Sequence, residues 1–410
     1  MPADERTGVL VVGGGPAGAS AAWHLARLGV PVTVVDRARF PRDKVCAEYL
    51  SPQAARILDA MGVMPAIERT RPARLAGMRV RSPAGSVISG SFAGAHRFRG
   101  HCDRGLALRR TLLDAILLDA ARSAGARIVE RVRVTALAHG SDGTVTGVEG
   151  VSGSGAAWRA SARLVVGADG LRTVVGRRAG LTRVARWPRR IALVTHFRDV
   201  AGMDEFGEMH VERGGYAGLA RVGEELVNFS LVVPMRSGVR DPERFLHDWI
   251  AARPHLASRF ARARRDGPVR VTGPFASSAR TAWCRGVALV GDAADFFDPF
   301  TGEGVYAALR GGELLAPFAA AAARGATREE CDAALRSYDA ARRREFGGKW
   351  AVERTIGAVI GIPAAMNHAA RALVRRRDMA DLLVGVTGDL VPAREVLRIG
   401  YVARLLLFGL

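Results

Sequence analysis

The fold of this chain is set at Val9-Leu10-Val11-Val12-Gly13-Gly14-Gly15-Pro16-Ala17-Gly18. Its four apolar residues, mostly β-branched, predict a buried parallel strand that stops at a run of glycines. Alanine-rich sequence from Ala17 to Leu28 then predicts a helix that a following glycine is placed to end. Gly13, Gly15 and Gly18 have the spacing G-x-G-x-x-G, which is typical of a dinucleotide-binding turn between a strand and a helix.

Each glycine of this spacing has its own physical role. The first permits the tight turn, the second lets the backbone approach a pyrophosphate, and the third lets helix and strand pack closely. Free N–H groups at the helix start would face the anion. A second strand, Val32 to Val35, ends at Asp36, where an acidic side chain can accept hydrogen bonds from the hydroxyls of an adenosine ribose. These features predict a dinucleotide site, and the alternative is a glycine-rich loop in an unrelated α/β unit.

Length and composition set the broad class. The 410 residues can bury a large core and predict two or more domains, and an apolar content of 49% is ordinary for a globular protein. The net charge of +20 comes almost entirely from arginine, because Lys44 and Lys349 are the only lysines among the 60 basic residues. The arginines are scattered without a zinc-finger or basic-helix pattern, so we expect no nucleic-acid partner. Attraction to anionic ligands or anionic lipid stays open.

The cysteines and the start of the chain favour the cytoplasm. Cys46, Cys102, Cys284 and Cys331 are far apart, which fits neither a disulfide framework nor a zinc site, so we expect a reducing compartment and no metal. The first strand begins within a few residues of the start, which leaves no room for a signal peptide. The apolar stretch Thr355 to Ala370 is interrupted by a proline and is too short to span a bilayer. We expect a cytoplasmic protein that is at most peripheral to a membrane.

Two further segments place acids and glycines at strand ends. The strand Ala160 to Val166 ends in Gly167-Ala168-Asp169-Gly170, at the edge where α/β proteins bind ligands. The strand Val287 to Val290 leads to Asp292, and the loop Asp298 to Gly304 then enters a helix. The exposed N–H groups and the positive dipole end of that helix would suit partial negative charge on a cofactor ring.

The region between these two segments has a different character. Short apolar runs with glycine-containing turns from Trp187 to Val233 predict an antiparallel sheet, and Arg74 to Phe92 predicts a hairpin. Pro242 to Arg264 predicts a helix with a break near Pro254, and the chain from Arg328 onward is expected to be helical. A β-sheet domain is thus inserted between two halves of a nucleotide-binding domain.

Together these segments resemble the FAD-dependent oxidoreductases of the para-hydroxybenzoate hydroxylase fold, a group that includes aromatic hydroxylases, flavin halogenases and geranylgeranyl reductases. The resemblance covers about residues 7–320. The segments Lys44-Val45-Cys46-Ala47-Glu48 and Pro299-Phe300-Thr301-Gly302-Glu303-Gly304 are most similar to the geranylgeranyl reductase branch. The resemblance implies an α/β fold in which a Rossmann-like FAD-binding domain carries an inserted antiparallel β-sheet substrate domain and a helical C-terminal region.

The resemblance also implies domain bounds and a cofactor site. The FAD-binding domain would comprise residues 1–75, 100–180 and 270–325, the substrate domain residues 76–99 and 181–269, and the helical region residues 326–410. FAD would be the resident cofactor, and NAD(P)H would visit transiently as the reductant. The implied FAD contacts are Gly13, Gly15, Pro16, Ala17, Gly18, Asp36, Arg37, Lys44, Arg110, Val134, Asp169, Gly291, Asp292, Pro299, Gly302 and Gly304.

Cys46 and Glu48 would lie beside the flavin ring, so we regard them as candidate catalytic residues. The alternatives are a small buried residue at Cys46 and a solvated loop acid at Glu48. This chain has Ala47 where the branch has glycine, and it keeps only Tyr216 of an aromatic segment that ends in Phe-Pro in the branch. The W-x-W-x-I-P segment of the halogenases is absent from the sequence, which argues against halogenation.

Three functions are compatible with the resemblance. The first is a reductase that uses NAD(P)H-derived electrons on an apolar small molecule such as an isoprenoid or polyketide. The second is a flavin-dependent monooxygenase that hydroxylates an aromatic or polyketide substrate, and the third is a flavin-binding protein without turnover. We favour the reductase.

The end of the chain, Arg394 to Leu410, combines arginines with an apolar stripe. The stripe consists of Val396, Leu397, Ile399, Val402, Leu405, Leu406 and Phe408, and the arginines are Arg394, Arg398 and Arg404. Core packing or a lid is the first interpretation. The second is a basic amphipathic helix that makes peripheral contact with a membrane, which would suit a lipid substrate.

Overall fold

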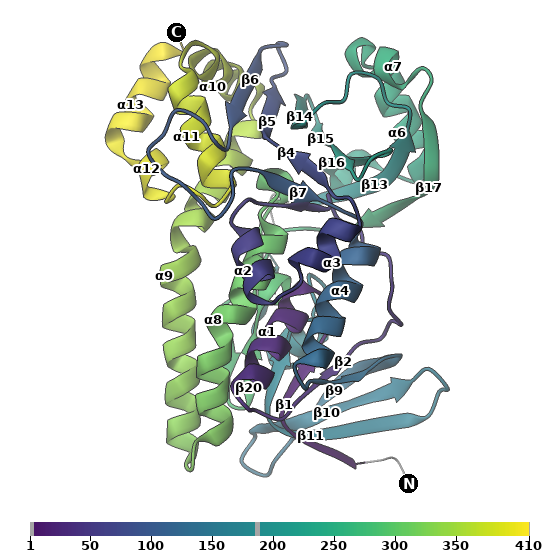
Figure 1. Cartoon of the computed structure of the whole chain (residues 1–410), viewed down its shortest axis with the longest axis vertical. Helices are drawn as coiled ribbons and strands as arrows, with labels where there is room; N and C mark the ends of the chain where they lie inside the picture. The colour runs from purple at the N-terminus through teal and green to yellow at the C-terminus, as the bar shows by residue number, and fades with distance from the viewer. Residues whose placement is uncertain (1–3, 185–188, 410) are drawn as a thin grey trace.

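Two large β-sheets and a set of long helices make up the molecule (Figure 1). The computed structural model describes residues 4–184 and 189–409. Residues 1–3 and Leu410, at the ends of the expected domains, and Trp187, the expected start of the antiparallel region, lie outside the described residues. In Figure 1 the parallel sheet lies in the lower half, the antiparallel sheet at the upper right and the C-terminal helices at the upper left. The expected fold class is confirmed.

The parallel sheet has the strand order β19-β20-β11-β1-β2-β8, and β9 and β10 extend it in antiparallel fashion from β11. Val9, Leu10 and Val11 of the central strand β1 have no exposed surface, as expected for a strand that is buried on both faces. The strands are β1 (Asp4–Val12), β2 (Val32–Val35), β8 (Arg127–Val129), β9 (Val132–His139), β10 (Val145–Ser152), β11 (Ala157–Gly167), β19 (Trp283–Cys284) and β20 (Val287–Leu289).

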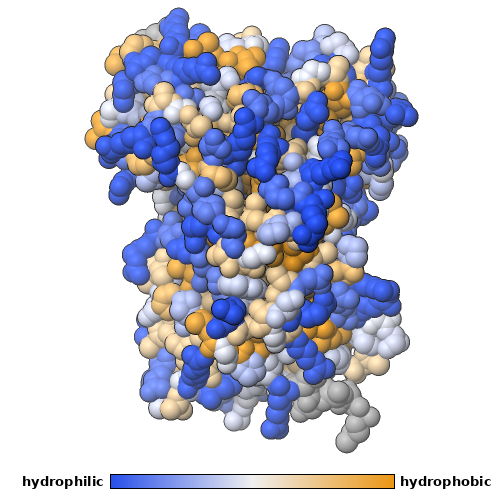
Figure 2. All heavy atoms as spheres, viewed as in Figure 1, coloured by the Kyte–Doolittle hydropathy of each residue, from blue (hydrophilic) through white to orange (hydrophobic). Residues whose placement is uncertain are grey.

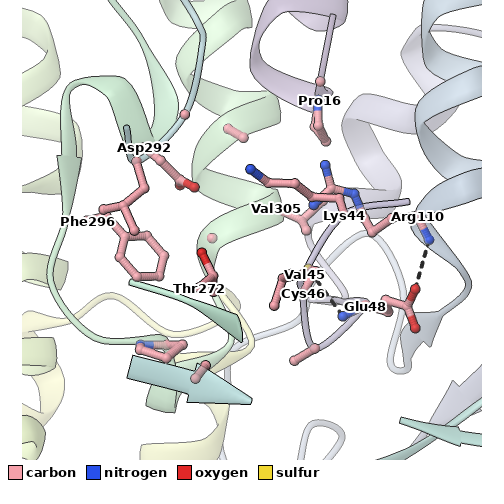
Figure 3. A pocket seen from close by; sticks show the side chains of 18 of the residues that line it. Pro16, Lys44, Val45, Cys46, Glu48, Arg110, Thr272, Asp292, Phe296 and Val305 are labelled. Carbon is pink, nitrogen blue, oxygen red and sulfur yellow. Dashed lines mark hydrogen bonds between the residues drawn. The ribbon is translucent and has the colours of Figure 1, made fainter. Parts of the chain in front are cut away.

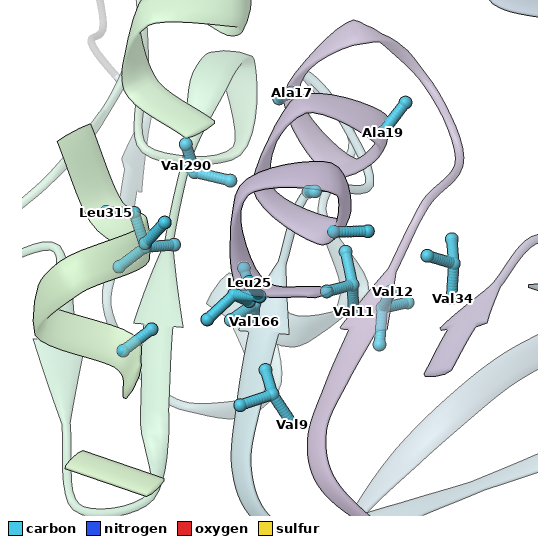
Figure 4. Close-up of a cluster of buried hydrophobic side chains, with 14 of the residues drawn as sticks. Val9, Val11, Val12, Ala17, Ala19, Leu25, Val34, Val166, Val290 and Leu315 are labelled. Atoms are coloured by element: carbon cyan, nitrogen blue, oxygen red, sulfur yellow. The ribbon is translucent and has the colours of Figure 1, made fainter. Parts of the chain in front are cut away.

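Helices α1 and α8 cross closely beside the parallel sheet, and Figure 4 shows the apolar side chains around them. Gly312 of α8 permits the crossing, because a Cβ there would lie 2.6 Å from the nitrogen of Ala21 and 2.8 Å from the carbonyl oxygen of Ala17. The hydroxyl of Ser20 donates to the carbonyl of Leu309 over 2.7 Å. The helices of this half are α1 (Pro16–Arg27), α2 (Ala54–Ala60), α3 (Met64–Arg69), α4 (Arg110–Ser123), α5 (Val174–Arg178), α8 (Gly304–Arg324) and α9 (Arg328–Ile360).

The second sheet has the strand order β17-β13-β16-β15-β14-β5-β6, with β14 and β5 as its parallel pair. Helices α6 and α7 cover one face through an apolar cluster around Phe229 and Trp249, and the other face borders the nucleotide-binding half. The elements are β5 (Gly77–Arg81), β6 (Val87–Ser91), β13 (Arg190–Arg198), β14 (Phe206–Glu212), β15 (Gly215–Val222), β16 (Leu226–Pro234), β17 (Arg264–Thr272), α6 (Pro242–Ala251) and α7 (Pro254–Phe260).

The C-terminal helices pack at the β6 edge of this second sheet. The carboxylate of Asp381 in α11 accepts hydrogen bonds from the backbone N–H groups of Ser91 and Ala95. These helices are α10 (Pro363–Arg375), α11 (Arg377–Thr387), α12 (Arg394–Leu397) and α13 (Ile399–Phe408). The remaining elements are short: β3 (Tyr49–Leu50), β4 (Ala73–Leu75), β7 (Gly105–Ala107), β12 (Thr182–Val184), β18 (Ser277–Ala279), β21 (Asp295–Phe296) and the 3₁₀ turns η1 (Met235–Ser237), η2 (Gly291–Ala293) and η3 (Pro299–Thr301).

One strand of the second sheet was not expected. The helix predicted from Pro242 to Arg264 breaks before Pro254 as expected, but it ends at Phe260, and Arg264–Thr272 forms the edge strand β17. The side chains of β17 are exposed or half-buried throughout, so the strand lacks the apolar alternation by which a strand is recognised.

The crossing of α1 and α8 gives a test of the fold. Gly312→Ala should lower the free energy of unfolding by about 1–3 kcal/mol, because the new Cβ would overlap backbone atoms of α1 that cannot move aside. Gly347→Ala in α9 is the matched control, because no atom lies within 4 Å of its Cβ position. That change should raise stability by up to about 1 kcal/mol through helix propensity. Denaturant titrations measure both, and equal effects would contradict the packing described.

Candidate functional site

A cavity of ≈ 270 Å³ lies between the carboxyl ends of the parallel strands and the open face of the antiparallel sheet. Figure 3 shows Lys44, Arg110 and Asp292 on its polar side and Phe296 and Thr272 nearer the antiparallel sheet. The sequence-predicted residues that line it are Gly13, Gly15, Pro16, Ala17, Asp36, Arg37, Lys44, Cys46, Glu48, Arg110, Asp169, Asp292, Pro299, Gly302 and Gly304. Segments far apart in the chain thus meet around one cavity.

The glycines of the first turn divide into packing and cavity positions. A Cβ on Gly13 would lie 2.4 Å from the carbonyl oxygen of Ala168, and one on Gly18 would lie 1.8 Å from the carbonyl oxygen of Gly13. A Cβ on Gly15 would meet only the ends of two arginine side chains, at 3.4 and 3.8 Å. Gly13 and Gly18 therefore let the strand, turn and helix pack, whereas Gly15 keeps the turn open toward the cavity.

Asp36 fixes the turn as well as facing the cavity. Its Oδ2 accepts a hydrogen bond from the backbone N–H of Gly14 over 2.7 Å, and its Oδ1 accepts one from Ala38 over 2.8 Å. Arg37, the next residue, is exposed at the rim. The carboxylate is thereby held at the end of β2, where the sequence predicts a ribose contact.

Cations surround the turn. The guanidinium of Arg110 at the start of α4 donates two hydrogen bonds to the carboxylate of Asp114, over 2.7 and 2.8 Å. Burial opposes its charge, but Asp114 raises the pKa of Arg110 above its usual value. Arg42, which the sequence analysis missed, has its Nη1 2.9 Å from Oδ2 of Asp114 and lies next to Gly15. Nothing in a loop with four basic residues distinguishes Arg42 as the one that reaches the turn.

Asp292 and Asp169 bring half-buried acids to the same cavity. Burial raises the pKa of Asp292 although Lys44 and Arg110 favour its charged form, and burial lowers the pKa of Lys44. The Oδ2 of Asp169 accepts hydrogen bonds from the backbone N–H groups of Val174 and Val175, over 2.6 and 3.2 Å. Within residues 4–184 and 189–409 its buried Oδ1 has no hydrogen-bond partner.

Three predicted cofactor residues do not line the cavity. Gly18 and Gly291 lie in crowded backbone, where a Cβ on Gly291 would be 2.8 Å from the Cβ of Ala17. Val134 is buried within β9. The structure gives these residues a packing role next to the cavity, and direct contact with a cofactor stays a prediction for them.

Glu48 is buried at the junction of the two halves, so the interpretation as a solvated loop acid is wrong. It is 1% exposed and has a left-handed backbone with φ 61°. Its Oε2 lies 2.6 Å from Nε2 of His196 and accepts a hydrogen bond from Asn228. Its Oε1 accepts a hydrogen bond from the backbone N–H of Arg110 (Figure 3). His196 and Asn228 come from β13 and β16 and were not foreseen.

Cys46 lies at the same junction. Its Sγ is 3.3 Å from the donating N–H of Glu48, and its carbonyl accepts a hydrogen bond from Asn228 over 2.9 Å. The thiol is half-buried and lines the cavity. The segment that carries Cys46 is therefore anchored on both sides, by α4 and by the antiparallel sheet.

The polar end of the cavity suits the adenine dinucleotide part of FAD. The open position at Gly15, the arginines beside it and the α1 N-terminus would receive the pyrophosphate. The carboxylates of Asp169 and Asp292, which line the cavity, offer acceptors further along. Gly302 has φ 73° just before the N-terminus of α8, and a Cβ there would lie 2.8 Å from Cδ1 of Tyr49, so glycine lets the loop pass close to that ring. The fold and the site together define an FAD-dependent oxidoreductase.

Known proteins agree with this class. A family model described as FAD binding domain matches residues 6–352. The digeranylgeranylglycerophospholipid reductase of Methanothrix thermoacetophila is 32% identical over 320 residues, which cover 75% of this chain and 76% of that protein. The menaquinone reductase of Mycobacterium tuberculosis is 27% identical over 425 residues, with 95% and 93% covered. The chain belongs to the FAD binding domain family, in its geranylgeranyl reductase-like branch.

The fold alone is shared more widely. The structure of the myxobacterial chondrochloren halogenase, an FAD-dependent halogenase, matches with a TM-score of 0.78 at 23% identity, over 85% of this chain and 82% of that one. The same fold thus occurs in a protein with another reaction, so the fold alone does not determine the reaction, and the residues that line the cavity do.

Buried charges lie behind the loop that ends at Gly304. Glu303 is 4% exposed, and its Oε2 lies 4.0 Å from Nζ of Lys349 in α9. Lys349 also contacts the carboxylate of Asp389. Burial raises the pKa of Glu303 to about 7 against the attraction of Lys349, and burial together with Glu303 raises the pKa of Glu353 to about 8.

Stability should therefore depend on pH through Glu303. An unfolded chain releases this proton near the ordinary pKa of 4.5, whereas the folded protein holds it up to about pH 7. The contribution of Glu303 to the free energy of unfolding is therefore fully present below pH 4.5 and is lost as the pH rises to about 7. Glu303→Gln should remove this fall from the plot of stability against pH. The difference in Tm between the variant and wild type should therefore shift in favour of the variant as the pH is raised from 4.5 to 8.

Thermal melts across pH 4.5–8 measure this effect. Glu353→Gln should keep the loss of stability that comes from Glu303. The matched control is Glu329→Gln, because Glu329 is an exposed acid in the first turn of α9. Parallel curves for Glu303→Gln and wild type would show that Glu303 is ionised in the fold throughout this range.

Proposed function

We propose that this protein is an FAD-dependent reductase that saturates carbon–carbon double bonds in the prenyl chain of a lipid or quinone, with electrons from NAD(P)H. Two of its relatives are a digeranylgeranylglycerophospholipid reductase and a menaquinone reductase, whose names describe prenylated, apolar molecules. The identities of 32% and 27% support the substrate class and not a particular lipid.

The apolar wall of the cavity carries the proposal. The antiparallel sheet contributes Ala192, Val194, Met209, Gly218 and Val232, and Phe275 and Phe296 lie beside them. Two hydroxyls on this wall are bound internally: that of Tyr216 donates to Asp298 over 2.5 Å, and that of Ser230 donates to Asn228 over 2.7 Å. Thr272 is the other hydroxyl-bearing residue of this sheet that lines the cavity. A wall with satisfied polar groups favours hydrocarbon over a substrate that needs hydrogen bonds.

The residues around the cavity would have different roles in binding and catalysis. FAD held in this cavity would supply the hydride-transfer chemistry between NAD(P)H and the substrate, and each double bond saturated consumes one NAD(P)H and one proton. Gly15, Arg42 and Arg110 would hold the pyrophosphate, and Asp36 the ribose. The apolar wall would orient the prenyl chain and exclude water. Glu48 would fix the position of the segment between the cofactor and the prenyl chain of the substrate. The side chain of Cys46 in this segment would face the reacting atoms.

A prenyl substrate of this kind is held in a bilayer, so the protein has to meet a membrane surface. The described cysteines are free thiols, which supports the reducing, cytoplasmic side of that membrane.

Anaerobic half-reactions test the proposal. Protein reduced by NADPH or NADH is mixed, without oxygen, with a detergent-dispersed geranylgeranyl lipid, and the flavin absorbance is followed. Reoxidation should occur only with the lipid. Cys46→Ala should retain FAD and its reduction by NAD(P)H but slow reoxidation by the lipid by roughly ten- to a hundredfold, because the side chain that faces the reacting atoms would be lost while the segment stays anchored.

Reduced protein that stays reduced with lipid and reacts only when oxygen is admitted would contradict the reductase and support a monooxygenase. Cys46→Ala protein that loses FAD would instead assign this segment to cofactor retention.

A further inference from the structure

The last helix, α13, presents apolar side chains to solvent. Ile399 is 88% exposed, Leu406 61% and Leu407 66%. Ile399, Val402 and Leu406 follow one another at spacings of three and four residues, so they share one face of the helix. Tyr401 points inward instead, where its hydroxyl donates to the carbonyl of Met379 in α11 over 3.0 Å. Core packing of the whole stripe, the first interpretation from the sequence, is therefore wrong for these outer residues.

Arginines frame this apolar face. Arg371 and Arg375 of α10 donate to the carbonyls of Gly409 and Phe408 at the end of α13, over 2.9 and 3.0 Å. The guanidinium of Arg376 lies 5.0 Å from the ring centroid of Phe408. Arg398 and Arg404, at the start and in the middle of α13, are exposed. Figure 2 shows apolar and hydrophilic side chains side by side at the upper left, where Figure 1 has α10 to α13.

The acids of this region offset only part of the arginine charge on the surface. Residues 361–409 contain seven arginines and four acids. Glu395 pairs with Arg398 over 2.8 Å, and Asp378 pairs with Arg376 over 2.9 Å. Of the other two acids, Asp381 is buried and Asp389 contacts Lys349. The outer side of α13 is thus apolar in its centre and cationic around it.

We propose that α13, with the adjoining end of α10, docks this protein on a bilayer surface that contains anionic phospholipids. Exposed apolar side chains would enter the headgroup boundary while the surrounding guanidinium groups meet lipid phosphates. In residues 4–184 and 189–409 none of the helices is both long and apolar enough to traverse a bilayer, so the contact is peripheral.

A second copy of the chain is the competing occupant. A two-fold dimer through α13 would bring the same arginines of both copies together, and like charges at an interface oppose association. The charge of the surface therefore favours an anionic bilayer.

The docking surface is linked to the proposed substrate wall, and this part of the inference rests on the proposed function. Val194, Met209 and Val232 of the cavity wall belong to the same hydrophobic cluster as Met366 of α10 and Tyr401 of α13. A membrane contact at α13 would thus bring a bilayer next to the apolar half of the molecule and away from the cofactor turn.

Vesicle sedimentation tests the docking without any turnover. FAD-loaded protein is mixed with vesicles of phosphatidylcholine alone or with added phosphatidylglycerol, both free of prenyl lipid. Binding should require phosphatidylglycerol and weaken as salt is raised. Leu406→Glu/Leu407→Glu should reduce binding at least tenfold by removing the apolar contact. Arg398→Gln/Arg404→Gln should reduce it by about twenty- to thirtyfold at low salt, from about 1 kcal/mol for each arginine.

The control Leu28→Glu/Leu112→Glu makes the same chemical change at two exposed leucines of the nucleotide-binding half and should bind like wild type. Equal binding to both vesicle types, or an equal loss in the control, would overturn the proposal. Absence of vesicle binding together with a change of molar mass in Leu406→Glu/Leu407→Glu would assign the face to a second copy. Retained vesicle binding without anaerobic reduction of a prenyl lipid would count against the proposed function and leave the docking intact.

Discussion

The buried carboxylate of Glu48 ties three parts of the protein together where its two large sheets meet. One oxygen receives the first backbone N–H of α4, and the other lies against His196 and Asn228 of the antiparallel sheet. A carboxylate that is 1% exposed is tolerated only when such partners surround it, and the left-handed backbone of Glu48 adds strain that the same bonds must offset. The segment Lys44 to Glu48 is thereby fixed between the cofactor turn and the apolar wall, and the geometry of the cavity depends on it.

This junction separates two chemical environments within one cavity. On one side, Arg42 and Arg110 share Asp114, and Lys44 favours the charged form of Asp292, so charges of both signs gather at the carboxyl edge of the parallel sheet. On the other side, the hydroxyls of Tyr216 and Ser230 are already bound within the protein, and most of the wall is apolar. An anionic dinucleotide and an apolar chain can therefore approach the same point from opposite ends, which suits transfer of reducing equivalents between them.

Much of this could be predicted from the sequence, because the signals are local. Gly13, Gly15 and Asp36 follow a continuous apolar strand, and Asp169 and Asp292 end two more, so their meeting at one sheet edge follows from parallel pairing. The partners of Glu48 could not be foreseen, since His196 and Asn228 reach it only through the register of β13 and β16. The edge strand β17 carries no apolar alternation. The outer face of α13 was ambiguous because an apolar stripe looks alike whether it meets a core or a membrane.

The proposed reductase transfers hydride to a carbon–carbon double bond and does not insert oxygen. The decisive measurement is mass spectrometry of the product formed from a prenyl lipid with NAD(P)H under an atmosphere of ¹⁸O₂. We expect a product heavier than the substrate by two hydrogen atoms for each double bond saturated, with no ¹⁸O. A product that gains one labelled oxygen atom would show that the protein is a monooxygenase instead.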